Sequence, residues 1–105
     1  MKRGDVYDVE DLPAGRRPVV IATCDVAIPV LSNVTVVLVT TTVRGIRTEV
    51  VLGESEGVVE GCVANCDNVF TLPKRALGRR RGALGPDKVR ALNDALRIAL
   101  DLDVA

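Results

Sequence analysis

Histidine and tryptophan are absent from this 105-residue chain, which has one tyrosine and one phenylalanine. Without His the chain lacks the commonest general base and a common metal ligand, so any chemistry must proceed without an imidazole. Tyr7 and Phe70 alone cannot form the row of aromatic rings on which modules for single-stranded RNA stack bases. Any binding of nucleic acid would therefore depend mainly on charge.

Charge and length set further limits. Basic and acidic side chains number 14 each, so the net charge is zero and a histone-like polycation is excluded. The length predicts one small domain over residues 1–105, which buries only roughly 60 to 65% of its unfolded surface. A second subunit can complete one face of so small a core, which favours a dimer. Thr and Asn interrupt the longest Val-rich run, so we expect no membrane span.

Three cysteines, Cys24, Cys62 and Cys66, are an odd number in a chain without a charged-then-apolar leader, which predicts a cytoplasmic protein in a reducing compartment. Zinc sites usually need two Cys pairs or accompanying His, so we expect no metal site. We interpret Cys62 and Cys66 as small buried apolar side chains. Residues 78–82 lack the Gly-Lys-Ser/Thr ending of a phosphate-binding loop, so we expect no nucleotide cofactor.

The hydropathy pattern predicts short strands followed by one helix. Alternating or continuous β-branched residues mark the strands at residues 4–9, 18–22, 35–43, 48–52, 62–65 and 68–72. Residues 44–47 predict a hairpin connection, and the Gly- and Glu-rich residues 53–61 predict an exposed loop. Pro86 and Asp87 begin a C-terminal amphipathic helix. Strands without intervening helices predict a mainly β (α+β) fold, a strongly curved antiparallel sheet that is complete by Leu72, with the helix packed on it.

Two groups of basic residues are candidate phosphate-binding sites. Residues 72–91 contain seven basic side chains and one acidic side chain, which could hold phosphates or form a solvated face that offsets acidic residues elsewhere. Arg16 and Arg17 precede Pro18 at the mouth of a predicted buried strand, where the sheet would hold a phosphate-binding cation in place. An Arg that pairs with a carboxylate on a neighbouring strand explains the same pattern.

Thr40, Thr41 and Thr42 end the longest predicted strand, with Thr40 and Thr42 on one face and Thr41 on the other. Their hydroxyls can donate hydrogen bonds to phosphate oxygens. Threonine also favours strands for its shape alone, so the pattern by itself does not select between the two roles.

Seven segments in this order resemble the MazF/PemK/Kid family of toxin endoribonucleases. They are Arg-Gly-Asp-Val-Tyr at 3–7, Arg-Pro-Val-Val-Ile at 17–21, Val-Thr-Thr-Thr-Val-Arg-Gly at 39–45, Thr-Glu-Val at 48–50, Val-Ala-Asn-Cys-Asp-Asn at 63–68, Thr-Leu-Pro-Lys at 71–74 and the closing helix. The resemblance spans nearly the whole chain. It implies a MazF/CcdB-like curved sheet with an SH3-like barrel core, and a symmetric homodimer.

The resemblance also implies an activity: sequence-specific, metal-independent cleavage of single-stranded RNA through its 2′-hydroxyl. A cognate antitoxin would neutralise the toxin by placing a flexible acidic tail in the RNA groove. Arg17 and Thr40 match the two family positions most associated with cleavage. The expected RNA-binding residues are Arg16, Thr41, Thr42, Arg44, Asn65 and Asn68. The loop before Arg17 is shorter than in many relatives, so no acidic catalytic residue is assigned.

Two other functions fit the same architecture. One is a CcdB-like toxin that binds DNA gyrase, but such toxins end in Trp-Gly-Ile, whereas this chain ends in Asp103-Val104-Ala105 and has no Trp. The other is a noncatalytic protein-binding module in which Arg17 only holds an ion pair.

Overall fold

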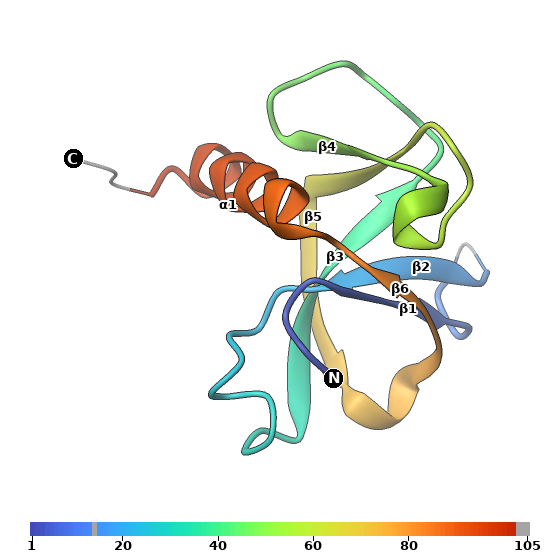
Figure 1. Ribbon diagram of the computed structural model, residues 1–105. Coiled ribbons are helices and arrows are strands. Elements are labelled where there is room, and N and C mark those ends of the chain that lie inside the picture. Colours follow the sequence, from blue (N-terminus) through green and yellow to red (C-terminus); the bar gives the residue numbers. More distant parts are fainter. Residues whose placement is uncertain (14, 103–105) are drawn as a thin grey trace.

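The computed structural model describes residues 1–13 and 15–102. These residues form a curved six-stranded antiparallel sheet in the order β4-β5-β3-β2-β1-β6, followed by a helix (Figure 1). The elements are β1 Asp5–Val9, β2 Arg17–Ile21, β3 Asn33–Thr40, β4 Glu49–Leu52, η1 Glu54–Glu56, β5 Cys62–Pro73, η2 Lys74–Ala76, β6 Leu77–Ala83 and α1 Pro86–Ala99, where η marks a 3-10 turn. The predicted mainly β architecture with a C-terminal helix is confirmed.

The sheet buries apolar side chains on both of its faces. In β2, Val19, Val20 and Ile21 are fully buried, as the continuous β-branched run predicts. Because strand residues alternate in direction, Val20 joins the apolar cluster that includes Leu92 of α1, while Val19 and Ile21 join a second cluster. The middle of β2 is therefore held from both sides, which fixes the position of the residues at its ends. None of the helices among the described residues has the length and apolar character that a membrane span requires.

The third strand is shorter than predicted. It ends at Thr40, because the Thr42 backbone N–H donates to the Thr40 hydroxyl at 3.1 Å and turns the chain out of the sheet. The predicted extension to Val43 is wrong, and so is the predicted alternation of Thr40, Thr41 and Thr42 across a strand.

The connection from β3 to β4 is not the predicted hairpin, since both strands pair with β5 rather than with each other. The Glu49 carboxylate organises this connection. It accepts hydrogen bonds from the backbone N–H groups of Arg44 at 3.1 Å and Gly45 at 2.9 Å. Residues 41–48 thus form a loop that is tied to the start of β4.

The two strands predicted at residues 62–65 and 68–72 are one strand, β5. Its pairing with β3 shifts in register, so that Val37 faces Val69 while Leu38 faces Asn65. The additional residues of β5 form a bulge that lets the strand continue.

The prediction that the sheet is complete by Leu72 is also wrong, because β6 adds a strand beside β1. Two buried carboxylates of β1, Asp5 and Asp8, pair with Arg80 and Arg81 of β6. The predicted exposed loop at 53–61 contains η1 and a buried Glu56, whose carboxylate accepts the Gly53 N–H at 2.8 Å.

Candidate active site

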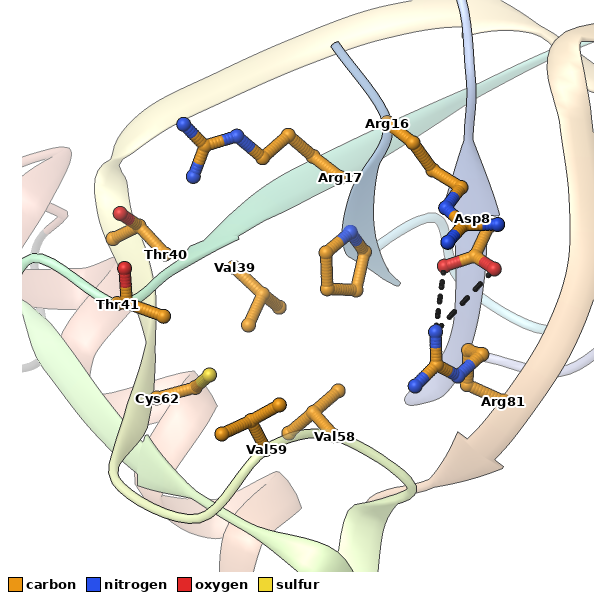
Figure 2. A pocket seen from close by; sticks show the side chains of 11 residues that line it. Asp8, Arg16, Arg17, Val39, Thr40, Thr41, Val58, Val59, Cys62 and Arg81 are labelled. Carbon is orange, nitrogen blue, oxygen red and sulfur yellow. Dashed lines mark hydrogen bonds and ion pairs between the residues drawn. The ribbon is translucent and has the colours of Figure 1, made fainter. Parts of the chain in front are cut away.

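A cavity of about 400 Å³ opens at one end of β2 and β3 (Figure 2). Side chains from β1, β2, β3, β5 and β6, and from the residues that adjoin β2, β3 and β5, surround it. They are Asp8, Arg16, Arg17, Pro18, Val39, Thr40, Thr41, Val58, Val59, Cys62 and Arg81. Four of the eight predicted catalytic and RNA-binding residues lie here: Arg16, Arg17, Thr40 and Thr41.

The pairing of β2 with β3 brings Arg17 and Thr40 together. Val19 faces Leu38 in the antiparallel ladder, and the same register carried two residues further places Arg17 opposite Thr40. Pro18 extends the backbone between Arg17 and the buried part of β2. In Figure 2 the Arg17 guanidinium reaches over the mouth of the cavity toward Thr40.

Arg17 forms no ion pair in the described part of the chain. The salt bridges there join Arg80 to Asp5, Arg81 to Asp8, Arg90 to Asp87 and Arg97 to Asp94. Arg17 is half-buried and lines an open cavity. Within the described residues, Arg17 therefore does not form the structural ion pair that was the alternative explanation for its position.

The Thr40 hydroxyl is held by the backbone of Thr42. Its oxygen accepts the Thr42 N–H at 3.1 Å, which leaves the hydroxyl proton to be donated elsewhere. Thr40 is half-buried, and Thr41 lines the cavity from the exposed bend that follows β3. Arg17 and Thr40 thus present a charged donor and a neutral donor to the same opening.

The other four predicted RNA-binding residues do not line this cavity. Thr42 and Arg44 are exposed on the loop at 41–48. Asn65 lies at the bulge of β5, where its side-chain oxygen accepts the Asp67 N–H at 3.0 Å, and Asn68 is exposed on the same strand. Their role in RNA binding stays a prediction.

Asp8 and Arg81 are cavity residues that the sequence interpretation did not identify. Asp8 is 4% exposed, and Arg81 Nη1 lies 3.2 and 3.4 Å from its two carboxylate oxygens. The lining contains three guanidinium groups against one carboxylate, which leaves a net charge of +2. The sequence signal for this pair is charge complementarity: β1 contains two Asp residues, and residues 79–81 are consecutive Arg residues.

The remaining basic residues of the 72–91 cluster are dispersed. Only Arg81 of the cluster lines the cavity. Lys74 donates to the Ile28 carbonyl, Lys88 donates to the Val51 carbonyl, and Arg80 pairs with Asp5. The cluster as a whole is therefore not one phosphate site.

The wall formed by Val58 and Val59 is tied to β6 by close backbone contact. A Cβ at Gly57 would overlap the carbonyl oxygen of Arg81, and a Cβ at Gly82 would lie 2.5 Å from the Glu56 carbonyl oxygen. Glycine at both positions lets η1 and β6 approach this closely. The same contact holds the backbone of Arg81 in place.

The cysteines take the places that the sequence predicts for them. Cys62 and Cys66 are buried and free, with 5% and 1% exposure. Burial, and then the negative charge of Asp67, raises the pKa of the Cys66 thiol to about 11, so this thiol stays protonated at neutral pH. Among the described residues, no three His, Cys, Asp or Glu side chains gather in a way that could hold a metal ion.

Comparison with known proteins gives consistent matches over nearly the full length. The family described as "PemK-like, MazF-like toxin of type II toxin-antitoxin system" matches residues 2–100. Endoribonuclease MazF3 of Mycobacterium tuberculosis is 46% identical over 87 residues, which cover 83% of this chain and 84% of that protein.

Two solved structures share the fold at substantial identity. The Mycobacterium tuberculosis toxin MazF-mt6 has a TM-score of 0.86 at 40% identity, covering 94% of this chain and 98% of its own. An endoribonuclease in complex with its cognate antitoxin, from a mycobacterial species, has a TM-score of 0.90 at 34% identity, covering 100% and 99%. The chain therefore belongs to the PemK-like, MazF-like toxin family of type II toxin-antitoxin systems.

Proposed function

We propose that this chain, an endoribonuclease toxin neutralised by a cognate antitoxin, cuts single-stranded RNA at a short sequence motif without a metal ion. The observation that carries the proposal is the shared opening of Arg17 and Thr40 in a cavity with net charge +2. Relatives named endoribonucleases, at up to 46% identity, support the same activity. The RNA supplies its own nucleophile, the 2′-hydroxyl, so the protein needs neither His nor an activated Ser.

In this reaction the 2′-oxygen forms a bond to phosphorus while the bond from phosphorus to the 5′-oxygen breaks. One proton leaves the 2′-hydroxyl and one is delivered to the 5′-oxygen. The products are a 2′,3′-cyclic phosphate and a 5′-hydroxyl end. The protein has to align the attack, stabilise the added negative charge and assist the two proton transfers.

Arg17 stabilises the charge. Its planar guanidinium can donate two parallel hydrogen bonds to the non-bridging phosphate oxygens, which a Lys ammonium cannot do. Because the pKa of a guanidinium is above about 12, Arg17 is poorly suited to take a proton at neutral pH. Its half-buried position at the end of a sheet strand keeps it oriented before RNA arrives.

Thr40 donates its free hydroxyl proton to the phosphate or orients the attacking hydroxyl. Arg16 and Thr41 contact the RNA within the cavity. Thr42 and Arg44 on the adjacent loop contact flanking nucleotides, as do the β5 residues Asn65 and Asn68. These contacts outside the cavity extend the binding site along the RNA, as the recognition of a sequence motif requires.

Two protein partners complete the proposal. The toxin is a homodimer, which suits a chain too short to bury a large core alone. A flexible acidic tail of the antitoxin occupies the positively charged cavity and competes with RNA there. The solved endoribonuclease in complex with its cognate antitoxin supports binding of an antitoxin. RNA and antitoxin would meet the toxin in the cytoplasm.

The test is to incubate the purified protein with defined single-stranded RNA in EDTA and to identify the ends of the products. We expect discrete cuts with 2′,3′-cyclic phosphate and 5′-hydroxyl ends. A matched RNA with one 2′-deoxynucleotide on the 5′ side of a mapped cut should resist cleavage there. Intact RNA would support the noncatalytic module instead, and cutting at the deoxynucleotide would rule out attack by the 2′-hydroxyl.

A further inference from the structure

Two ion pairs join β1 to β6, and they differ in what they face. Arg80 lies 3.4 Å from Asp5, and Arg81 lies 3.2 Å from Asp8. Each Asp is buried and each Arg is partly exposed. Of these two pairs, only that of Asp8 and Arg81 lines the cavity that Arg17 also lines. Neighbouring residues of one strand thus provide a pair inside the site and a matched pair outside it.

Not all N–H donors of the Arg81 guanidinium are used by Asp8. A guanidinium carries five N–H donors, and both contacts to Asp8 are made by Nη1 alone. The Arg81 side chain is 31% exposed, whereas that of Asp8 is 6% exposed. The buried carboxylate therefore fixes one edge of the guanidinium, while other N–H groups remain available to a ligand in the cavity.

The position of Arg81 suits an anion other than the one held by Arg17. In Figure 2 Arg17 and Thr40 lie on one side of the opening, and Asp8 and Arg81 lie on the other. The backbone of Arg81 lies in close contact with that of Gly57. An RNA strand carries a phosphate at every nucleotide, so a strand across the opening can reach both sides.

We propose that Arg81 binds a phosphate of the RNA next to the scissile phosphate, and that Asp8 is the positioning residue that holds the Arg81 guanidinium in place. This inference rests on the proposed function, because it assumes that RNA occupies the cavity with its scissile phosphate at Arg17. It adds a second phosphate contact, which strengthens binding without taking part in the bond changes.

The experiment removes one phosphate charge at a time. Once a cut is mapped, RNA oligonucleotides are made with a single 2′-deoxynucleotide at the cut, so that they bind intact. Each linkage next to the cut is replaced in turn by an uncharged methylphosphonate. The Kd of every oligonucleotide is measured by fluorescence anisotropy for the unsubstituted protein, for Arg81→Gln and for Arg80→Gln, the matched control.

We expect one adjacent methylphosphonate to weaken binding to the unsubstituted protein about 10-fold, the effect of losing a charge-assisted contact. Arg81→Gln should weaken binding of the native RNA by a similar factor and abolish the penalty for that methylphosphonate. Arg80→Gln should keep the full penalty. A double-mutant cycle of this kind isolates the contact between Arg81 and the phosphate.

Asp8→Asn tests the positioning role. It should reduce the same methylphosphonate penalty, whereas a variant that is merely less stable would bind all oligonucleotides in unchanged ratios. An unchanged penalty in Arg81→Gln, or no penalty at any adjacent linkage, would overturn this inference. The proposed function would still stand if the protein cuts RNA. A protein that cuts no RNA would overturn both.

Discussion

Replacing Gly57 by Ala tests how firmly the Val58 and Val59 wall of the cavity is held against β6. Gly57 has φ +83° and Gly61, in the same segment, has φ +86°, so both lie in the left-handed region. A Cβ at Gly57 would overlap the Arg81 carbonyl oxygen, whereas a Cβ at Gly61 would meet no atom within 4 Å. The two Ala variants therefore share the backbone strain and differ in the contact.

The structure sets the expected size of each effect. Left-handed backbone costs an L-residue roughly 1–2 kcal/mol, so Gly61→Ala should lower the free energy of unfolding by about that amount. Overpacking against a fixed backbone adds about 1–3 kcal/mol, so Gly57→Ala should cost about 2–5 kcal/mol. Small domains are stable by only about 5–15 kcal/mol, so the difference is measurable without complete loss of folding.

Urea unfolding followed by far-UV circular dichroism gives this comparison, because the chain has no Trp for fluorescence. Both variants are measured at one protein concentration, since subunit association alters apparent stability. In the folded fraction, Gly57→Ala should also lower kcat/KM for RNA, because the displaced backbone carries the cavity wall. Equal destabilisation by the two substitutions would refute the claim that contact with β6 holds this segment.

Four further predictions concern single side chains. Thr40→Val should cut RNA at least about 10-fold more slowly than Thr40→Ser, since only Ser keeps the hydroxyl; equal rates on end-labelled RNA would remove that hydroxyl from the reaction. Glu49→Ala should speed hydrogen exchange at the Arg44 amide, measured by NMR, because the loop loses its carboxylate acceptor; unchanged exchange would show that the loop is held otherwise. At pH 8, iodoacetamide should modify the exposed Cys24 and spare Cys66, whose pKa of about 11 leaves about one thiol in 1,000 ionised, as peptide mapping would detect. The same raised pKa makes the free energy of unfolding depend on pH. The contribution of Cys66 is complete below its unfolded pKa of about 9.0 and is lost as the pH rises toward 11. Urea unfolding of Cys66→Ala should not show this loss.

The strands that bury apolar residues on both faces could be predicted from sequence. The run of Val19, Val20 and Ile21 is β-branched throughout and too short for a buried helix, so length and residue type favour a strand. The end of β3 could not be placed in the same way. Thr41 and Thr42 favour strands by shape, but the hydrogen bond from the Thr42 amide to the Thr40 hydroxyl turns the chain out of the sheet.

The strand β6 was missed because its stabilising partners lie far away in sequence. Residues 78–82 show no apolar alternation, so the sequence predicted no strand there. Arg80 and Arg81 become strand residues through Asp5 and Asp8 of β1, more than 70 positions away. The Arg81 and Asp8 side of the candidate site depends on this pairing, whereas Arg17 could be located because it adjoins a strongly predicted strand.

The central claim is that the Arg17 guanidinium stabilises the charge that develops on the scissile phosphate. Its most direct test is the single-turnover cleavage rate of Arg17→Ala on a defined RNA, with folding verified by circular dichroism. Loss of a preorganised donor to the reacting phosphate predicts a rate at least about 100-fold lower. A folded Arg17→Ala protein that cuts RNA at the parental rate would contradict the claim.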